Sequence, residues 1–397
     1  MESYDVIVIG AGLAGLQAAR LLAGHGLSVL LADRKLSLEQ SVHTTGIFVR
    51  RSLEDFSLPP ACLGAPIRQV TLYSPGRRKL VLESPREEFR IGRMAALYAR
   101  LLKDCQAAGA KWLPGASYFG CEADAFGSLV RLEVGGRERA IRARFVIGSD
   151  GAASRVARDL GLSVNQQWIV GLEEVYEDVR PQGPPQLHCF LDRRLAPGYV
   201  AWIAADTDSV HVGVGGYREK FQPSAALDAF RGTIREIVDL RPARLVERRG
   251  GRIPVGGVLP RLACPRGLLI GDAAGAVSPL TAGGLDPCLR LTELAAKVTH
   301  RFLTSGDAGQ LAAYDGTRFR RQFLARRALR AVYRLAGHNL LLEACCAVLR
   351  SGPGRRLAEH IFFSRGSFPD VHDVDSATGA ESALRGNAQQ RKAVAVN

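Results

Sequence analysis

A glycine-rich turn near the start of the chain carries the residues with the most definite chemistry. The turn contains Gly10, Gly12, Leu13, Ala14 and Gly15. Glycines at this spacing allow a tight turn and close approach of a pyrophosphate, and the N-terminus of a following helix favours its negative charge. Asp33, at the end of the next apolar run, supplies a carboxylate that can accept a hydrogen bond from a ribose hydroxyl. The pattern predicts a dinucleotide site, and an acid at position 33 indicates a free 2′-hydroxyl, as in FAD or NAD. Arg34 beside it is either a cofactor contact or solvated.

The elements that must position this turn follow from hydrophobic spacing. Residues 5–9 are an apolar, β-branched run, which is typical of a strand buried on both faces of a parallel sheet. Residues 13–22 have apolar positions at helical spacing, and residues 28–31 are a second apolar run. The segment is therefore predicted to be a strand, helix and parallel strand, with the glycine turn at the end of the first strand.

Two later segments also end an apolar run with an aspartate. Residues 144–158 predict a strand, then Asp150-Gly151, then a helix capped near Ser154. Residues 267–275 predict a strand that delivers Gly271 and Asp272 into a turn before a helix. Taken singly, each aspartate is also compatible with ordinary helix capping.

In their order and separation, the three segments resemble the FAD motifs of the flavoprotein superfamily that contains aromatic hydroxylases, geranylgeranyl reductases and flavin-dependent halogenases. The resemblance covers about residues 1–310. It implies that Asp272 binds the ribityl chain, that Asp150 lies near the pyrophosphate and that Arg93 contacts the cofactor. It implies FAD, and because no attachment residue is evident we expect it to be bound without a covalent link.

The segment after Asp272 is expected to lie against the flavin ring. In the relatives this loop, here with Pro279, Gly283, Gly284 and Leu285, touches the isoalloxazine, and the following helix N-terminus favours the anionic reduced flavin. Geranylgeranyl reductases usually have Gly-Glu-Gly here, whereas this chain has Ala282-Gly283-Gly284. Any role of that glutamate is therefore absent.

The substrate side rests on weaker signals. Tyr199 and Trp202 resemble the aromatic pair that lines an apolar cavity in geranylgeranyl reductases, with one extra residue between them; the alternative is that they belong to the sheet core. The loop expected under the flavin contains His43, Thr44 and Thr45. His43 is a candidate general acid or a structural residue, and the threonines are candidates for hydrogen bonds to the flavin or to nearby backbone.

The predicted fold is α/β, with a Rossmann-like FAD-binding domain, an inserted mixed β-sheet substrate domain and a helical C-terminus. We assign the FAD-binding domain to residues 1–66, 93–162 and 256–310, the substrate domain to 67–92 and 163–255, a helical region to 311–363 and a flexible tail to 364–397.

Charge and cysteine usage constrain the partners. The 397 residues carry 53 Lys+Arg against 39 Asp+Glu, a net charge of +14. Seven arginines fall in one stretch: Arg318, Arg320, Arg321, Arg326, Arg327, Arg330 and Arg334. Residues 318–349 form a basic amphipathic pattern that suits an anionic membrane surface or a solvated helix face. Nucleic acid is not expected as a partner.

The eight cysteines form no C-x-x-C pair or zinc cluster, so we expect no metal and a reduced, cytoplasmic setting. The longest uninterrupted apolar run, residues 6–16, is far short of the ~18 residues that span a bilayer.

These observations predict an FAD-dependent oxidoreductase. The expected reaction is hydride transfer between flavin N5 and a carbon–carbon double bond of an apolar, isoprenoid-like or polyketide-like substrate. The alternative is a monooxygenase that uses a flavin hydroperoxide. A halogenase is less expected because the Trp-x-Trp-x-Ile-Pro segment is absent around Trp202, and a non-catalytic FAD-binding redox partner is a further alternative. No second Gly-x-Gly-x-x-Gly unit follows residue 50, so NAD(P)H or another protein is expected as a transient electron donor.

Overall fold

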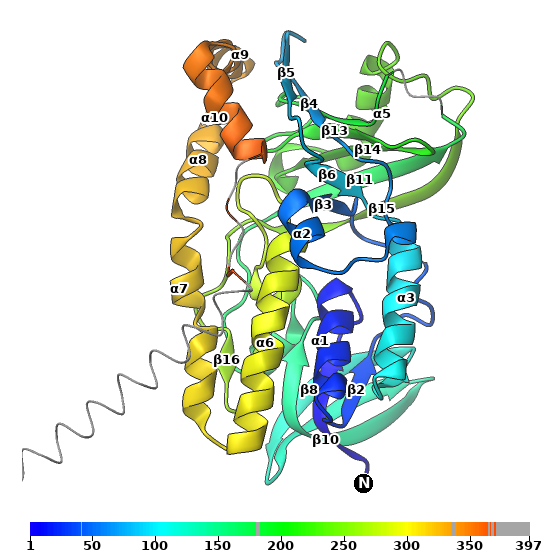
Figure 1. The fold of residues 1–397 in the computed structure, drawn as a ribbon, viewed down its shortest axis with the longest axis vertical. Helices are drawn as coiled ribbons and strands as arrows, with labels where there is room; N and C mark the ends of the chain where they lie inside the picture. Colours follow the sequence, from blue (N-terminus) through cyan, green and yellow to red (C-terminus); the bar gives the residue numbers. More distant parts are fainter. Residues whose placement is uncertain (41, 180–182, 336–337, 364–365, 367–368, 371–397) are drawn as a thin grey trace, which may run out of the picture.

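The computed structural model describes residues 1–40, 42–179, 183–335, 338–363, 366 and 369–370. The predicted tail, residues 364–397, lies almost entirely outside the described residues. Two β-sheets lie one above the other, and a column of helices from the C-terminal part of the chain runs beside both (Figure 1).

The first sheet contains the predicted dinucleotide unit. Its strands are β1 (Ser3–Ile9), β2 (Val29–Ala32), β7 (Lys111–Leu113), β8 (Ala116–Asp124), β9 (Gly127–Val134), β10 (Arg137–Gly148), β16 (Ala263–Cys264) and β17 (Gly267–Leu269), and the main path is β16-β17-β10-β1-β2-β7. Val6, Ile7 and Val8 of β1 are fully buried, as a strand covered on both faces requires. Helices α1 (Leu13–Gly24), α3 (Met94–Ala107) and α6 (Leu285–Ser305) pack together beside the sheet.

Parallel pairing brings the predicted motifs to one edge of this sheet. β1 is parallel to β2 and to β10, and β10 is parallel to β17. Since the carboxyl ends of parallel strands lie at the same edge, Gly10, Asp33, Asp150 and Asp272 follow four neighbouring strand ends. This topology explains how residues far apart in the sequence can form one site.

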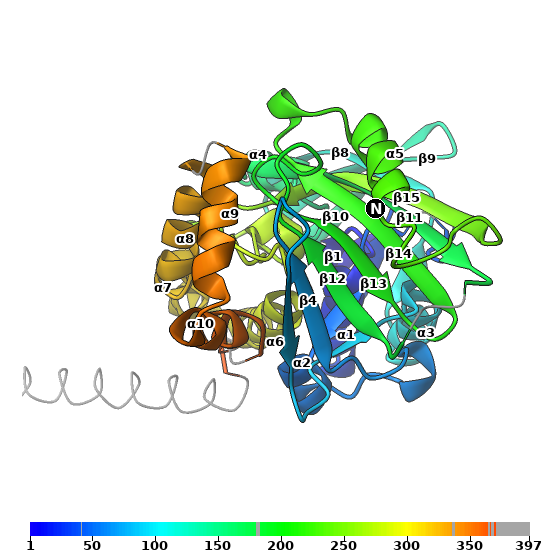
Figure 2. The same cartoon turned by 90° about the horizontal axis from the view of Figure 1, so that it is seen from above.

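The second sheet faces that edge and has the order β15-β11-β14-β13-β12-β4-β5. Its strands are β4 (Gln69–Tyr73), β5 (Lys79–Glu83), β11 (Trp168–Glu177), β12 (Gln186–Phe190), β13 (Ala201–Ala205), β14 (Ser209–Gly216) and β15 (Arg244–Pro254). All of them come from the two segments that we assign to the substrate domain. Figure 2 shows α5 (Pro223–Thr233) lying across this sheet. Val210, Val212 and Val214 of β14 pack with Leu227 and Phe230 of α5, so the alternate residues of β14 face the other way.

Short elements lie between the main strands and helices. They are β3 (Ile47–Val49), α2 (Arg50–Asp55), η1 (Pro60–Cys62), β6 (Phe89–Ile91), α4 (Arg155–Asp159), η2 (Arg218–Lys220) and η3 (Gly271–Ala274). β3 pairs with β6 in a two-stranded ribbon.

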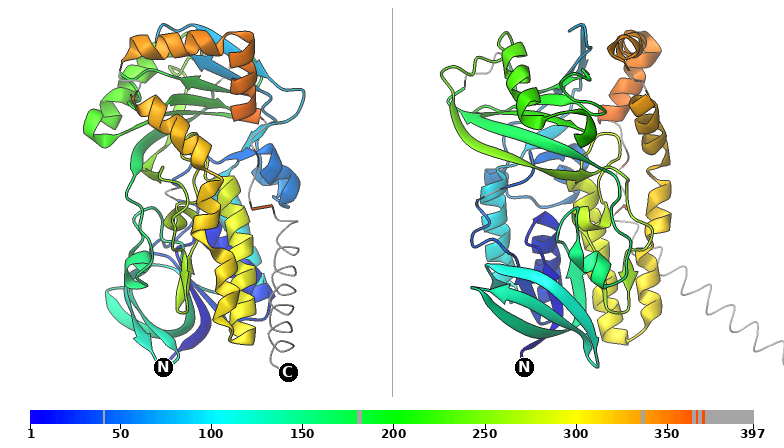
Figure 3. Two further views of the ribbon diagram at one scale, coloured as in Figure 1. Left: turned by 90° about the vertical axis from the view of Figure 1, so that its left-hand side faces the viewer. Right: turned by 180° about the vertical axis from the view of Figure 1, so that it is seen from behind.

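The C-terminal helices extend from the first sheet to the second (Figure 3). They are η4 (Ala308–Tyr314), α7 (Gly316–Arg321), α8 (Leu324–Leu335), α9 (Asn339–Leu349) and α10 (Gly352–Phe363). Arg330 of α8 is buried and donates to the carbonyl of Pro279 (2.8 Å) and to that of Gly198 (3.3 Å). One arginine of the basic stretch is therefore a structural cross-link between the predicted flavin loop and the second sheet. In the described part of the chain, no helix is both long and apolar enough to span a membrane.

Candidate cofactor and substrate site

A cavity of about 1290 Å³ lies between the two sheets and continues to the C-terminal helices. It begins at the glycine turn and the ends of β1, β2 and β10, passes the loop before α6, and reaches β11, β12 and α8–α10. Typical small-molecule pockets measure about 300–1,000 Å³. The cavity therefore has room for a dinucleotide and a second ligand.

The glycine turn leaves backbone open to this cavity. Gly10 has φ +102°, and a Cβ there would lie 2.2 Å from the Ser149 carbonyl oxygen. A Cβ on Gly12 would meet nothing within 4 Å, so this side of the turn is free for a ligand. Asp33 Oδ2 accepts a hydrogen bond of 2.6 Å from the Ala11 amide, which fixes the turn against β2. Leu13, Ala14, Asp33 and the exposed Arg34 line the cavity as well.

The two later aspartates differ in what holds them. The Asp150 carboxylate accepts hydrogen bonds from the Ser154 hydroxyl (2.6 Å) and from the Arg155 amide (2.7 Å), so it caps the start of α4 while lining the cavity. Asp272 lines the cavity, and no described residue donates a hydrogen bond to its carboxylate. Burial raises the pKa of Asp272 to about 6. A half-buried acceptor with no donor among the described residues fits the ribityl hydroxyls of FAD.

The loop before α6 is held in a closed turn. The Ser278 amide donates to the Gly283 carbonyl (3.0 Å), and the Ala282 amide donates to the Ser278 carbonyl (2.9 Å). Ala282 has φ +51°, a conformation that costs a residue with a Cβ about 1–2 kcal/mol. Gly283, Gly284 and Leu285 line the cavity at the N-terminus of α6, where the helix dipole favours negative charge.

Three predicted cofactor residues do not line the cavity. Gly15 lies against β1, because a Cβ there would be 1.8 Å from the Gly10 carbonyl oxygen; it permits helix–strand packing. The Pro279 carbonyl accepts from Arg330. The Arg93 guanidinium extends to Asp208, with Nη2 3.1 Å from its carboxylate oxygen. Contact of Arg93 with the cofactor stays a prediction without support from this placement.

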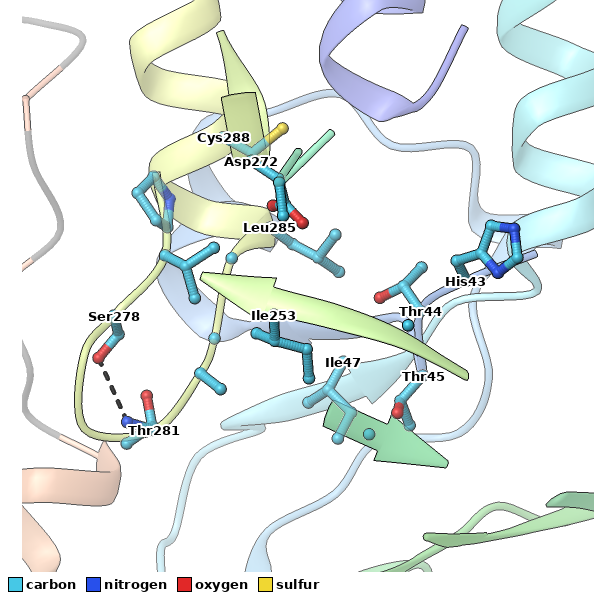
Figure 4. A pocket seen from close by; sticks show the side chains of 18 of the residues that line it. His43, Thr44, Thr45, Ile47, Ile253, Asp272, Ser278, Thr281, Leu285 and Cys288 are labelled. Atoms are coloured by element: carbon cyan, nitrogen blue, oxygen red, sulfur yellow. Dashed lines mark hydrogen bonds between the residues drawn. The ribbon is translucent and has the colours of Figure 1, made fainter. Parts of the chain in front are cut away.

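The loop that carries His43, Thr44 and Thr45 lies at the cavity wall, and its side chains point in different directions. Figure 4 shows Thr44 and Thr45 near Ile47 and Ile253, and the His43 ring turned away from Leu285. Burial, followed by the positive charges of Lys35 and Arg34, lowers the pKa of His43. His43 is therefore a neutral imidazole at pH 7. It lies near Arg34 and Lys35, which follow Asp33 in the sequence.

Tyr199 and Trp202 both line the cavity. Trp202 lies on β13, whereas Tyr199 precedes that strand. The Trp202 ring lies against β14 because Gly213 has no side chain: a Cβ there would be 2.2 Å from Trp202 Cε2. Tyr199 packs beside Gly215, and its ring meets the Trp202 ring edge-on, with an interplanar angle of 72°. The Tyr199 hydroxyl donates to the Thr281 carbonyl (2.7 Å), so this tyrosine also joins the sheet to the loop before α6.

Glu173 and Arg249 line the cavity from β11 and β15, although neither residue was predicted from the sequence. Burial alone would raise the pKa of Glu173, but the neighbouring His211 and Arg249 and the Thr45 hydroxyl outweigh it and lower that pKa to about 2. The C-terminal helices add an apolar wall that was not predicted either, and it includes Leu329, Val332, Leu342, Leu349, Ile361 and Phe362. The sequence feature that could have indicated Glu173 is a pair of adjacent acids, Glu173 and Glu174, within an otherwise apolar strand.

Comparison with known proteins agrees with this geometry. A family model described as an FAD binding domain matches residues 3–326. Digeranylgeranylglycerophospholipid reductase 1 from Methanothermobacter thermautotrophicus is 30% identical over 336 residues, which cover 79% of this chain and 82% of the relative.

Solved structures show the same fold at lower sequence identity. A geranylgeranyl bacteriochlorophyll reductase-like protein from Thermoplasma acidophilum superposes with a TM-score of 0.80 and 21% identity, covering 92% of this chain and 98% of that chain. A myxobacterial chondrochloren halogenase superposes with a TM-score of 0.69 and 18% identity, covering 94% and 95%. The family match extends over most of the chain and confirms FAD as the predicted cofactor. The chain therefore belongs to the FAD binding domain family and has digeranylgeranylglycerophospholipid reductases among its relatives.

Proposed function

We propose that this chain reduces carbon–carbon double bonds of a long apolar substrate, of the isoprenoid kind named in its relatives. The observation that carries the proposal is that one continuous cavity has a dinucleotide-binding turn at one end and an apolar wall at the other. That wall is formed by Leu187, Leu191, Leu342, Leu349, Ile361 and Phe362. An apolar chain is stabilised there by about 25 cal/mol for each Å² of surface removed from water.

Different residues along the cavity would bind FAD and contact the substrate. Gly12, Asp33, Asp272 and the N-terminus of α6 would hold FAD, which when bound and reduced supplies a hydride. Tyr199 and Trp202 present aromatic surface for the substrate. Figure 4 shows the intervening part, where residues of the 43–47 loop approach Ile253 and Leu285.

Saturating a double bond also requires a proton, for which His43 is the predicted candidate, whereas Thr44 and Thr45 are predicted to form hydrogen bonds to the flavin or nearby backbone. The Thr45 hydroxyl donates its hydrogen to Glu173, so it offers a ligand only an acceptor. The Thr44 hydroxyl oxygen accepts from the Gly46 amide (3.2 Å) and keeps its own hydrogen for a ligand. His43 retains one N–H in its neutral form. Figure 4 shows the Thr44 hydroxyl turned toward the cavity, so Thr44 can donate a hydrogen bond to a ligand there, whereas His43 remains the candidate proton donor.

The experiment is anaerobic turnover of dithionite-reduced holoprotein with a geranylgeranyl-bearing lipid. The proposal predicts reoxidation of the flavin that depends on substrate, with a gain of two hydrogens for each bond reduced. No reoxidation without oxygen, together with a product that carries an oxygen atom from O₂, would instead support the monooxygenase. Titration with NADH and NADPH under the same conditions tests whether either is the transient donor or whether another protein is required.

We also propose that the outer face of α8–α10 contacts anionic membrane. Leu324 and Val332 of α8 and Leu340 of α9 are 56%, 62% and 86% exposed, and the exposed Arg321 and Arg334 lie on α7 and α8. Val332 also lines the cavity, so the cavity reaches the surface beside these residues. A mouth at this face would admit a lipid chain directly from a bilayer.

Co-sedimentation with vesicles tests this contact. Basic residues near an anionic surface contribute about 1 kcal/mol each, so Arg321→Glu with Arg334→Glu should lower binding to phosphatidylserine-containing vesicles by at least tenfold. Binding to purely zwitterionic vesicles should be weak for both proteins. Equal binding of the wild type to the two kinds of vesicle would show that the arginines are only a solvated face.

A further inference from the structure

Glu173 is a buried carboxylate in the wall of an otherwise largely apolar cavity, and both of its oxygens are occupied. It is 4% exposed. Oε1 accepts from Arg249 Nε at 2.8 Å and lies 3.2 Å from His211 Nδ1. Oε2 accepts from Trp202 Nε1 at 2.8 Å and from the Thr45 hydroxyl.

The two oxygens serve different parts of the molecule. Arg249 is the residue directly opposite Glu173 in the β11–β15 pairing, and it supplies the compensating charge within the sheet. Thr45 belongs to the loop before β3, and Trp202 lies on β13. One carboxylate oxygen therefore joins the loop expected under the flavin to the aromatic surface expected to bind substrate.

We propose that Glu173 is a positioning residue that fixes Thr45 and Trp202 relative to each other at the meeting point of the two sheets. Through this oxygen, Thr45 is held with its hydroxyl hydrogen turned away from the cavity, and the Trp202 indole is held flat over Gly213. The consequence for turnover rests on the double-bond reduction proposed above. The positioning itself is a property of the chain without ligand.

The charge state of Glu173 suits this task. Because the neighbouring Arg249, His211 and Thr45 hold its pKa well below the usual range, the carboxylate stays an anion at neutral pH and accepts hydrogen bonds at both oxygens. Glutamine at this position keeps the shape, but one of its two terminal groups becomes a donor. It cannot accept from Arg249 and from the Thr45–Trp202 pair at once.

Glu174 provides a matched control on the same strand. It is 3% exposed and faces the opposite side of β11, where it lies 3.4 Å from Arg231 and 3.6 Å from Arg248. It does not line the cavity. Glu174→Gln therefore weakens a buried charge cluster of similar kind without touching Thr45 or Trp202.

The first readout needs neither cofactor nor substrate. In a Trp112→Phe/Trp168→Phe background Trp202 is the one remaining tryptophan, and its emission and acrylamide quenching report on the indole. Glu173→Gln should change both, by at least twofold in the quenching constant, whereas Glu174→Gln should leave them as in the parent. Unchanged Trp202 fluorescence in Glu173→Gln would overturn the proposal.

The second readout is turnover and pairwise coupling. Glu173→Gln should lower kcat at least tenfold while the Kd for FAD changes less than threefold, and Glu174→Gln should keep kcat within threefold even at an equal loss of Tm. The kcat effects of Glu173→Gln and Thr45→Val should be non-additive, because one acts through the other. Additive effects, or equal loss of kcat in the two glutamine variants, would refute a positioning role.

The fluorescence and turnover measurements distinguish failure of the positioning role of Glu173 from failure of the proposed function. If the wild type reduces no double bond, the proposed function fails, while the fluorescence arm still decides whether Glu173 positions Trp202. If Glu173→Gln does not fold, Thr45→Val and Trp202→Phe replace it, since each removes one donor to Oε2. Their effects on kcat should again be non-additive, and additive effects would contradict the proposal.

Discussion

Replacing Asp272 with asparagine should stabilise the protein without FAD and, at the same pH, weaken its binding of FAD. Burial raises the pKa of Asp272 from 3.8 to about 6, and no described residue offsets its charge with a hydrogen bond. A difference of about two pKa units corresponds to roughly 3 kcal/mol. The ionised carboxylate therefore destabilises the empty site at pH 7 by an amount of that order.

The sign of the pH dependence follows from proton binding. Between pH 4 and 6 the folded apoprotein binds a proton at Asp272 that the unfolded chain does not bind. The contribution of this group to stability is therefore largest below about pH 4, falls as the pH rises to about 6, and is constant above that. Asparagine does not titrate, so the variant should lose this part of the slope and be more stable than the wild type at pH 7.

FAD binding should respond in the opposite direction. A hydrogen bond to a charged acceptor contributes about 1.5–3 kcal/mol, so the variant should bind FAD about 10- to 150-fold more weakly at pH 7. In the wild type, affinity should decrease as the pH falls below about 6, because protonation removes the charge. Urea unfolding of apoprotein from pH 4.5 to 8 and quenching of flavin fluorescence measure the two effects.

Asp150→Asn is the matched control for this experiment. Burial raises the pKa of Asp150 as well, but its carboxylate accepts hydrogen bonds from Ser154 and Arg155 that asparagine would lose in part, so Asp150→Asn should stabilise the apoprotein less than Asp272→Asn does. The reasoning is refuted if Asp272→Asn destabilises the apoprotein at pH 7 and leaves FAD affinity unchanged. That outcome would mean that Asp272 is satisfied inside the protein.

Three further substitutions test local geometry. Ala282→Gly removes the cost of φ +51° and should raise the free energy of unfolding by about 0.5–1 kcal/mol after the entropy of glycine is subtracted; a lower Tm would count against strain in this loop. Gly213→Ala places a methyl group 2.2 Å from Trp202, so it should displace the ring and weaken substrate binding, and unchanged substrate affinity would contradict the assignment of this wall. Trp202→Ala should lower apparent substrate affinity about 10- to 100-fold with FAD binding retained; loss of FAD with substrate binding intact would show that Trp202 is core.

The dinucleotide end of the cavity was predictable because its signals are local. Gly10, Gly12 and Asp33 lie within one strand–helix–strand unit, and their spacing alone specifies which backbone must stay open. The parallel pairing of β1, β10 and β17 then brings Asp150 and Asp272 to the same edge, as the motif order implied. Short-range patterns and one topological rule were sufficient here.

Glu173 could not be found in the same way, because its partners are set by register between distant strands. Thr45 is 128 residues away in the sequence and Arg249 is 76 residues away. A shift of one residue in the pairing of β11 with β15 would turn Glu173 to the other face of the sheet. The arginine-rich stretch posed a related difficulty, since the helical pattern does not reveal that Arg330 is buried against two backbone carbonyls while Arg334 is exposed.

The contrast between the Asp272 and Glu173 carboxylates explains why one cavity can serve two kinds of ligand. At the ends of the parallel strands, Asp272 and the open backbone at Gly12 leave hydrogen-bonding groups without internal partners, so this end favours a polar ligand. At the second sheet, both oxygens of Glu173 accept hydrogen bonds, from Arg249, Trp202 and Thr45. The charge of Glu173 is therefore compensated within the protein. What that wall then offers a ligand is mainly aromatic and aliphatic surface. The polarity of each end of the cavity therefore depends on whether its acid has hydrogen-bond donors within the protein. Because the charged Glu173 carboxylate has such donors, its end of the cavity can still accept an apolar substrate.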